Sequence, residues 1–139
     1  MKVYGDDPVE VKCRVISRGR GRGPLLVSDE PLSFLGGVDP STGEVIDRKH
    51  PLHGRSMRGK VILIPGGKGS TVGSYVIYQM ARNGTAPAAI ICLNAEPIIA
   101  TGAIMAGIPM VDRPSEDLLG VMEDSMEVEV DAEEGKIRF

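Results

Sequence analysis

The chain has 139 residues, of which 42% are hydrophobic and 25% are charged, and its formal net charge is -3. This size and mixture are typical of one globular domain with a real core, and the small net charge argues against nucleic acid or an anionic membrane as a partner. The apolar stretch at residues 86–106 is interrupted by Pro87, Asn94, Glu96 and Pro97, so it does not predict a membrane span.

The two cysteines and the N-terminal residues indicate the cellular compartment. The two cysteines, Cys13 and Cys92, lie far apart, each within an apolar run. Residues 1–7 lack the apolar core of a signal peptide. We therefore expect a cytoplasmic protein whose two thiols fill the core rather than bind a ligand.

The first 60 residues are expected to be rich in β-structure. Residues 9–17 alternate apolar and polar side chains, as a half-buried strand does. The run RGRGRG at residues 18–23 predicts a basic, glycine-rich turn, and residues 24–32 predict a second strand or a pair of short ones. Residues 35–44 are dense in turn-forming residues.

The middle of the chain predicts a β-α-β-α-β order. Strands are expected at residues 60–65, 88–93 and 108–111, and an apolar helix at residues 97–106. The first helix is expected from about Val72, because apolar residues recur there at helical spacing, and it should end at Gly84.

The last part of the chain predicts a helix that starts at Ser115, followed by a hairpin over residues 126–139 with its turn at residues 133–136. No internal repeat or linker is visible in the sequence. We therefore expect residues 1–139 to form one α/β domain rather than two.

The stretch PGGKGSTVGS at residues 65–74 lies between a predicted strand and a predicted helix. Its spacing fits neither a P-loop nor the dinucleotide-binding pattern of glycines. It places Ser70 beside backbone N–H groups at the positive end of a helix dipole. Two interpretations stay open: Ser70 or Thr71 simply caps the helix, or the loop is an anion-binding or catalytic site.

Other polar residues give weaker indications. His50 and His53 are separated by Pro51, which argues against a helical pair of metal ligands and favours loop histidines bonded to the backbone. The basic run at residues 18–22 suits a phosphate or a partner's carboxylates, although a solvated turn is more common. Asp39 is expected to cap its own turn.

Four motifs in this order resemble the small subunit of the aconitase X group of hydro-lyases. They are PLSFLGGVDPSTGEVID at residues 31–47, HPLHG at 50–54, PGGKGS at 65–70 with the following Gly-Ser at 73–74, and RNGTAPAAII at 82–91. The resemblance covers nearly the whole chain. It implies a swivelling β/β/α barrel, the fold of the mobile fourth domain of aconitase.

The resemblance also implies an activity. Members of the two-subunit archaeal type are expected to dehydrate (R)-mevalonate 5-phosphate to trans-anhydromevalonate 5-phosphate in the mevalonate pathway of isoprenoid synthesis. The position that matches the family's proton acceptor is Ser70, and Lys68, Gly69, Thr71 and Gly67 are implied as substrate-binding residues. The family often has Arg where this chain has Lys68, and Lys cannot form a bidentate carboxylate clamp.

An iron–sulfur cluster, of the [4Fe–4S] type, is the cofactor implied. A cluster with an open iron needs three thiolates, and this chain has two cysteines. We therefore expect no metal in this chain, a cluster on a large partner subunit, and activity only in that heterodimer or a higher assembly. The face that carries residues 35–39, 50–54 and 66–74 is expected to meet this partner.

Three other functions remain open at this stage. A cis-3-hydroxy-L-proline dehydratase of the same group would keep the fold and the serine base. A phosphohistidine-carrying swivelling domain would use His50 or His53, although the sequence lacks the setting typical of that class. A non-catalytic binding module would use the glycine loop only to cap a helix.

Overall fold

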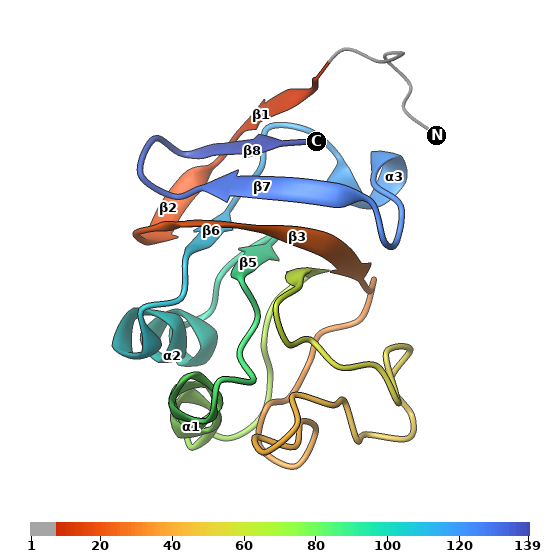
Figure 1. Ribbon diagram of the computed structural model, residues 1–139, viewed down its shortest axis with the longest axis vertical. Helices are drawn as coiled ribbons and strands as arrows, with labels where there is room; N and C mark the ends of the chain where they lie inside the picture. Colours follow the sequence, from red (N-terminus) through yellow and green to blue (C-terminus); the bar gives the residue numbers. More distant parts are fainter. Residues whose placement is uncertain (1–7) are drawn as a thin grey trace.

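The computed structural model describes residues 8–139, which form eight strands and three helices (Figure 1). The strands are β1 (Glu10–Lys12), β2 (Arg14–Ser17), β3 (Arg20–Val27), β4 (Val61–Ile64), β5 (Ala89–Cys92), β6 (Met110–Asp112), β7 (Glu127–Asp131) and β8 (Lys136–Arg138). The helices are α1 (Gly73–Asn83), α2 (Pro97–Ala106) and α3 (Leu118–Val121). The signal-peptide prediction concerned residues 1–7, which lie outside the described part.

The strands form one sheet in the order β1-β8-β7-β3-β4-β5-β6-β2. β1 and β2 stand at opposite ends of this order but are separated in the chain by Cys13 alone, so the sheet curls until its edges meet. β3 to β6 run parallel, and the other pairs are antiparallel. This closed sheet with α1 and α2 packed outside it confirms the predicted swivelling barrel.

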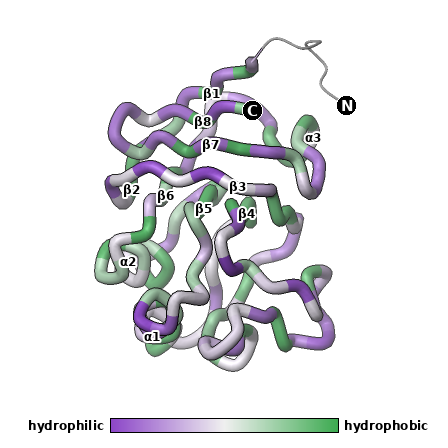
Figure 2. The backbone as a smooth tube through the Cα atoms, viewed as in Figure 1, coloured by the Kyte–Doolittle hydropathy of each residue, from purple (hydrophilic) through white to green (hydrophobic). Residues whose placement is uncertain are grey.

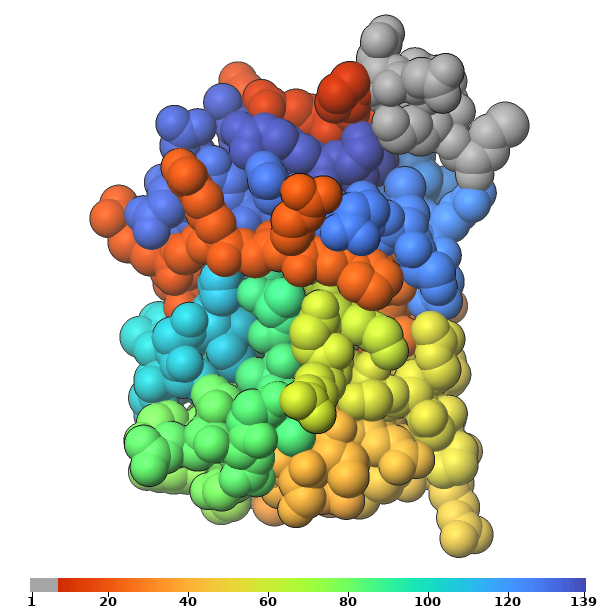
Figure 3. All heavy atoms as spheres, viewed as in Figure 1, coloured from red at the N-terminus to blue at the C-terminus, as the bar shows by residue number. Residues whose placement is uncertain are grey.

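The two ends of the chain build one half of the molecule and its middle builds the other. Figure 3 shows the red-orange N-terminal strands and the blue C-terminal hairpin together in the upper half, and the segments between them in the lower half. Both halves share β3, which pairs with β7 on one side and with β4 on the other. The glycine loop belongs to the lower half.

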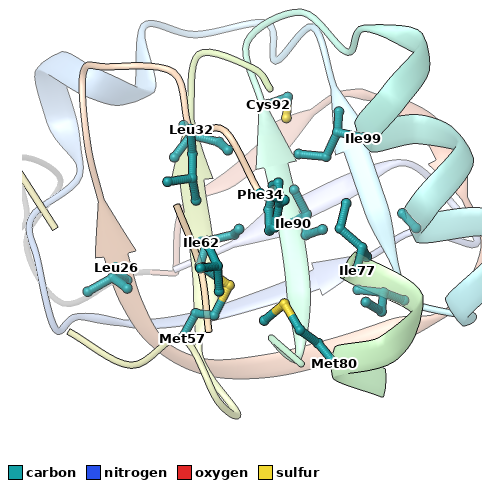
Figure 4. Close-up of a cluster of buried hydrophobic side chains, with 14 of the residues drawn as sticks. Leu26, Leu32, Phe34, Met57, Ile62, Ile77, Met80, Ile90, Cys92 and Ile99 are labelled. Carbon is teal, nitrogen blue, oxygen red and sulfur yellow. The ribbon is translucent and has the colours of Figure 1, made fainter. Parts of the chain in front are cut away.

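β4 and β5 are buried on both faces, which explains their unbroken apolar sequences (Figure 2). Alternate residues of a strand point to opposite faces of the sheet. Those inside the barrel pack with β7 and β8, and they are Val61, Leu63, Ala89 and Ile91. Those on the outer face pack under α1 and α2, and they are Ile62, Ile64, Ile90 and Cys92 (Figure 4).

The helices and a long irregular segment cover that outer face. α1 contributes Ile77 and Met80, and α2 contributes Ile99 (Figure 4). The two helices approach closely at Gly102, where a Cβ would lie 2.7 Å from the Ile77 Cδ1 atom. Residues 28–60 contain isolated bridges rather than strands, and they fill the rest of this layer with buried side chains such as Phe34.

The helix boundaries follow local signals at two helices of three. α1 ends at Gly84 with φ +73°, and α2 begins at Pro97, as predicted. The predicted helix start at Ser115 is wrong, because the Ser115 N–H donates to the Lys12 carbonyl (2.8 Å) and α3 begins only at Leu118. Within residues 8–139, no helix is long and apolar enough to cross a bilayer.

The predicted turn at residues 18–23 is also wrong, because β3 starts at Arg20. The arginines of the RGRGRG run point outward, where Arg20 pairs with Asp131 (3.4 Å). The glycines point inward against other backbones. A Cβ on Gly21 would collide with the Ala88 carbonyl oxygen, and one on Gly23 would lie 2.5 Å from the Gly59 oxygen. The alternation of arginine and glycine therefore indicates a strand rather than a turn.

Other strand predictions needed smaller corrections. The strand expected at residues 9–17 is broken at Cys13 into β1 and β2, which pair with different partners. The strand expected at residues 24–32 ends at Val27, and the one expected at residues 108–111 lies one or two residues later. The C-terminal hairpin is confirmed as β7 and β8.

We predict that Gly21→Ala destabilises the fold by about 1 to 3 kcal/mol, because the added methyl overlaps the Ala88 carbonyl in a region of strand packing. Urea unfolding monitored by circular dichroism measures this cost. Arg22→Ala, on the exposed face of the same strand, is the control and should change the free energy of unfolding by no more than about 0.5 kcal/mol. Equal costs for the two variants would contradict this account of the glycines.

Candidate functional site

The glycine loop at residues 65–72 follows β4 and leads into α1, at the carboxyl end of the parallel strands. Ligands of open α/β sheets bind at this edge, because loops from neighbouring strands converge there. Two backbone hydrogen bonds hold the loop: the Leu32 N–H donates to the Gly66 oxygen (3.1 Å), and the Lys68 N–H donates to the Leu32 oxygen (3.1 Å). The loop is thus tied to a buried core residue.

Two of its glycines are required by close neighbours. A Cβ on Gly67 would lie 2.5 Å from the Glu96 Oε1 atom and 3.3 Å from the Ile99 Cβ atom. Gly69 has φ +91°, and a Cβ there would lie 2.5 Å from the Ser33 Oγ atom. The glycines therefore let the loop pass between residues 32–35 on one side and the start of α2 on the other.

Ser70 is exposed at the tip of this loop. Its Oγ accepts a hydrogen bond from the Val72 N–H (3.1 Å), which closes a local turn before the helix. Val72 is the residue that precedes α1, and its side chain makes no capping bond. Among the described residues, no acceptor lies within reach of the Ser70 hydroxyl proton, so the hydroxyl is available to an incoming group.

Three consecutive backbone N–H groups beside Ser70 are also available. Within residues 8–139, the N–H groups of Gly69, Ser70 and Thr71 donate to no protein acceptor. The next N–H groups are satisfied, that of Val72 by the Ser70 hydroxyl and that of Gly73 by the Ser70 carbonyl (2.9 Å). Free N–H groups next to the N-terminus of a helix form a site for negative charge.

The neighbouring helix α2 offers no such donors. The Glu96 carboxylate accepts hydrogen bonds from the Ile98 N–H (2.8 Å) and the Ile99 N–H (2.7 Å), so it caps the helix with both oxygens. The negative charge of Glu96 is thereby placed at the positive end of the α2 dipole. An anion approaching this corner finds donors at the start of α1 and not at the start of α2.

An ion pair between the exposed Arg14 and the buried Asp112 fixes the turn that carries Glu96. The fully buried Asp112 carboxylate accepts two hydrogen bonds from Arg14, from Nε and Nη2 (2.8 Å each), and one from the Ala95 N–H (2.8 Å). Burial alone would raise the pKa of Asp112. The Arg14 and Ala95 hydrogen bonds outweigh that effect and hold this pKa below its usual value.

The surface next to Ser70 is only slightly hollowed. A depression of about 160 Å³ lies between the first turns of α1 and α2, lined by Thr71, Ser74, Pro97, Ile98 and Thr101. Pockets that enclose a small molecule usually measure roughly 300 to 1,000 Å³. The described part of the chain therefore presents one wall of a binding site rather than an enclosed pocket.

The structure brings together the residues that the sequence proposed for the site. Gly67, Lys68, Gly69, Ser70 and Thr71 lie on the one loop, and the last four of them are exposed. Within the described residues, the Lys68 ammonium group makes no ion pair. The loop therefore carries an exposed cation, an exposed hydroxyl group and free N–H groups within four consecutive residues.

The two histidines have different settings. His50 is buried, and its Nδ1 accepts a hydrogen bond from the Leu52 N–H (3.1 Å). Its Nε2 therefore carries the proton and donates to the carbonyls of Glu30 (3.3 Å) and Pro31 (3.2 Å). Both nitrogens are used, so His50 supports the segment before Leu32. His53 is exposed.

Asp39 and the basic run have structural partners. The Asp39 Oδ1 atom accepts a hydrogen bond from the Ser41 N–H (2.9 Å), which confirms the predicted turn cap. Of the basic run, Arg18 lies 3.8 Å from Glu133 and Arg22 lies 3.4 Å from Glu127. These pairs lie beside the antiparallel strands β3 and β7, away from the glycine loop.

Neither cysteine is suited to a metal. Cys92 packs in the core under α2, whereas Cys13 packs at the barrel core on the other side of the sheet. Burial, reinforced by the charges of Asp112 and Glu96, raises the pKa of Cys92 to about 12. Burial with Asp112 and Asp131 raises the pKa of Cys13 to about 11. Both thiols are therefore protonated at neutral pH.

Sequence reasoning did not identify Glu96 and Asp112. A signal for Glu96 was present, because a polar residue directly before Pro97 is typical of a helix start. No local signal marks Asp112, because its partner Arg14 lies 98 positions earlier in the chain. Glu96 and Asp112 affect the site indirectly, because their carboxylates bond the backbone N–H groups of Ala95, Ile98 and Ile99.

Comparisons with known proteins show which family and which relatives this chain resembles. The family profile described as "Aconitase X swivel domain" matches residues 10–139. A relative named phosphomevalonate dehydratase small subunit, from Methanothermobacter thermautotrophicus, is 88% identical over 131 residues, which are 94% of this chain and 100% of the relative. A second protein of that name, from Methanocella arvoryzae, is 54% identical over 94% of this chain and 99% of its own length.

Solved structures show the same fold. Aconitase X from Thermococcus kodakaraensis, in its holo-form, superimposes with a TM-score of 0.88 at 49% identity, over 93% of this chain and 96% of that one. A 3-isopropylmalate dehydratase from Methanocaldococcus jannaschii superimposes with a TM-score of 0.58 at 19% identity, over 86% of this chain and 75% of that one. The second likeness concerns the fold alone.

We predict that Asp112→Asn lowers the free energy of unfolding at pH 7 by about 1 to 3 kcal/mol, the usual cost of weakening a buried charged hydrogen bond. Because the folded pKa of Asp112 is depressed, its contribution is present above the unfolded pKa and disappears as the pH falls through the folded pKa. The variant should therefore lose less stability than the parent between about pH 4 and pH 2.

Urea unfolding at pH 7 and at pH 3 measures both effects. The matched control is Asp124→Asn, because Asp124 pairs with Arg55 at 3.1 Å on the surface and such a pair contributes about 0 to 1 kcal/mol. If Asp112→Asn behaves like Asp124→Asn at pH 7, the buried pair does not anchor the turn before α2.

Proposed function

The chain belongs to the aconitase X swivel domain family, and from that membership we propose that it is the small subunit of a hydro-lyase that dehydrates (R)-mevalonate 5-phosphate to trans-anhydromevalonate 5-phosphate. Relatives 88% and 54% identical to it are named phosphomevalonate dehydratase small subunits, and the chain covers nearly their whole length. The structural observation that carries the proposal is the exposed Ser70 hydroxyl beside three free N–H groups.

Ser70 is the proton acceptor of this reaction. Its Oγ, as an alkoxide, takes the proton from the carbon next to the substrate carboxylate and becomes a hydroxyl group. The C–H electron pair forms the double bond while the C–O bond breaks, and the departing hydroxide takes the proton from the Ser70 hydroxyl to leave as water, which restores the alkoxide. An alkoxide requires nearby positive charge, and the Val72 N–H, which already donates to Oγ, and the start of α1 supply part of it.

The rest of the loop binds the anionic substrate. The free N–H groups of Gly69 and Thr71 suit a carboxylate oxygen, and the exposed Lys68 side chain adds a positive charge to the same loop. Gly67 contributes space rather than a contact, because any side chain there would displace Glu96. Together, these groups of the loop stabilise the negative charge that develops during proton removal.

The cofactor implied by the family, an iron–sulfur cluster, does not fit this chain. The two thiols are protonated and lie on opposite sides of the sheet, and residues 8–139 contain no group of three or more metal-ligating side chains. We assign the cluster, of the [4Fe–4S] type, to the large subunit. This chain therefore contributes the base and one wall of the site.

The assembly is a heterodimer, or a higher assembly of such pairs, in the cytoplasm. The relatives' names call them small subunits, and the shallow surface next to Ser70 needs a second wall. The two free cysteines suit a reducing compartment. No feature of the described fold suggests that nucleic acid or a membrane takes part.

Two other functions are less well supported. A cis-3-hydroxy-L-proline dehydratase would use the same base, but the relatives' names favour the phosphorylated substrate. Offering both compounds to the reconstituted two-subunit complex separates these activities. A phosphohistidine domain that uses His50 is disfavoured, because His50 is buried with both nitrogens bonded, and the setting of His53 in the sequence is not typical of that class.

We predict that Ser70→Ala, in the reconstituted complex, lowers kcat by about 100- to 10,000-fold, the usual effect of removing a positioned acid–base group. Subunit assembly should be retained, because the lost hydrogen bond to the Val72 N–H costs about 1 kcal/mol at most. Steady-state assays on mevalonate 5-phosphate, together with size-exclusion chromatography, measure both quantities.

Ser74→Ala is the internal control for this prediction. The Ser74 hydroxyl is buried and donates to the Thr71 carbonyl (2.8 Å), so its loss should reduce stability while most of the activity remains. A Ser70→Ala complex that turns over within a few-fold of the parent would show that Ser70 is only a turn residue, and the non-catalytic binding module would then be the better interpretation.

We also predict that the isolated chain purifies colourless and free of iron, because its thiols cannot supply three thiolates. The complex with the large subunit should contain iron and inorganic sulfide. Metal analysis of the two samples, prepared under the same anaerobic conditions, makes the comparison. Stoichiometric iron in the single chain would place the cluster, at least in part, on this subunit.

A further inference from the structure

We propose that Arg113 binds the phosphate group of the substrate, while the glycine loop binds the carboxylate end. Arg113 is thereby the residue of this chain that selects a phosphorylated hydroxy acid. The inference rests on the proposed function, because it adds a second binding group to that same site.

Arg113 lies at the same edge of the sheet as the glycine loop. β4, β5 and β6 are parallel neighbours, so the segments that follow them meet at one edge. The glycine loop follows β4, Asn94 lies two residues after β5, and Arg113 directly follows β6. The Asn94 N–H donates to the Pro65 carbonyl (3.2 Å), and a Cβ on Gly66 would lie 3.1 Å from the Asn94 carbonyl oxygen. Asn94 therefore connects the start of the loop to the end of β6.

The Arg113 guanidinium group lies on the side of β6 that faces the glycine loop. Its Nε donates to the Asn94 Oδ1 atom (3.4 Å). In the sheet, β6 has β5 on one side and β2 on the other. Because Asn94 belongs to the β5 side, the arginine side chain extends toward β4 and its loop rather than toward β2.

This guanidinium group has no carboxylate partner. Arg113 is exposed, and within residues 8–139 it makes no ion pair. The two carboxylates at this edge are already engaged, because Glu96 caps α2 and Asp112 is paired with Arg14. The hydrogen bond to Asn94 uses one of five guanidinium N–H donors. The others suit the bidentate binding of a phosphate.

The backbone of Arg113 is strained. Its φ of +49° lies in the left-handed region, which residues other than glycine rarely adopt. Hydrogen bonds hold this conformation on both sides, because the Arg113 N–H donates to the Leu93 carbonyl (3.1 Å) and the Ser115 N–H donates to the Lys12 carbonyl (2.8 Å). Strained residues persist only where the surrounding fold enforces them, and they cluster at ligand-binding sites. The strain at Arg113 is therefore a second indication of a site.

The spacing of the two binding groups matches the length of the substrate. Neighbouring strands lie about 4.8 Å apart, so the ends of β4 and β6 are separated by roughly 10 Å. An extended chain advances about 1.3 Å per single bond, which places the carboxylate and the phosphate of mevalonate 5-phosphate roughly 8 Å apart. A substrate whose carboxylate lies at the glycine loop therefore brings its phosphate within reach of Arg113.

This assignment also accounts for the choice of substrate. A hydroxyproline carries no phosphate, so its binding would leave the Arg113 cation without an anion. Mevalonate 5-phosphate supplies that anion at the end of the molecule remote from Ser70. Discrimination of this kind depends on a charged group that one substrate pairs and the other does not.

Binding to the assembled complex tests the proposal. The two-subunit complex carrying Ser70→Ala is titrated with mevalonate 5-phosphate and with unphosphorylated mevalonate by isothermal titration calorimetry. Adding Arg113→Gln should raise the dissociation constant of mevalonate 5-phosphate by about 10- to 100-fold, because a charged hydrogen-bonded pair is lost. The affinity for mevalonate should change by no more than about 2-fold. Arg113→Lys should recover part of the loss, because it restores the charge but not the bidentate geometry.

Arg58→Gln is the matched control. Arg58 is also exposed and makes no ion pair within the described residues, but it lies just before β4, at the opposite edge of the parallel strands. It should leave both affinities unchanged. The melting temperature of the isolated Arg113→Gln chain should equal that of the parent, because glutamine and arginine adopt the same backbone conformation at similar cost. Equal weakening of the two ligands by Arg113→Gln would overturn the proposal.

The outcomes separate this inference from the proposed function. If the parent complex has no dehydratase activity but Arg113→Gln selectively weakens mevalonate 5-phosphate, the phosphate site stands and the proposed reaction is wrong. If the parent complex dehydrates mevalonate 5-phosphate and Arg113→Gln binds it within about 2-fold of the unchanged residue, the reaction stands and the phosphate site is wrong. A complex that binds neither compound contradicts both.

Discussion

Two backbone hydrogen bonds to Leu32 hold the glycine loop, and the rest of the site depends on them. The Leu32 side chain is buried in the core of the outer layer, so the loop is bonded to a rigid part of the fold. His50 secures the same segment from its other side through the carbonyls of Glu30 and Pro31. An anchored loop can present N–H groups in a fixed direction, and fixed dipoles stabilise charge without reorganisation during the reaction.

The same corner contains two helix starts with opposite electrostatic roles. The Glu96 carboxylate occupies the donors of α2, and the Asp112–Arg14 pair holds the turn on which Glu96 stands. α1 lacks a side-chain cap, and the N–H groups just before it are free. Because the N–H groups at the start of α2 are occupied and those just before α1 are free, an anion is directed to Ser70. The Glu96 cap also explains why Gly67 must lack a side chain, since the capping carboxylate passes beside it.

Sequence patterns predicted the elements whose signals are local. The two long helices, the central apolar strands and the C-terminal hairpin follow from periodicity, caps and turn residues. The predictions failed where contacts between distant segments decide the structure. The contacts with the Ala88 and Gly59 backbones explain why β3 contains glycines, and the ion pair with Arg14 explains why Asp112 is buried. Neither contact could be predicted from local sequence. The glycine loop and Ser70 were located from their position between a predicted strand and a predicted helix, and the family motifs suggested a role for Ser70. Their supports at Leu32, Glu96 and Asp112 required the fold.

The proposed base, Ser70, lies on a separate, exposed wall, and this position has an electrostatic consequence. In the isolated chain, the Ser70 hydroxyl and the free N–H groups face water, whose high dielectric constant weakens their interaction with any anion. When a partner covers this wall, water is excluded and the same dipoles act with greater strength. On the proposed mechanism, the charge of the Ser70 alkoxide is then stabilised mainly in the assembled state. Placing the proposed base on a separate subunit would thus confine strong proton abstraction to the complex that holds the substrate.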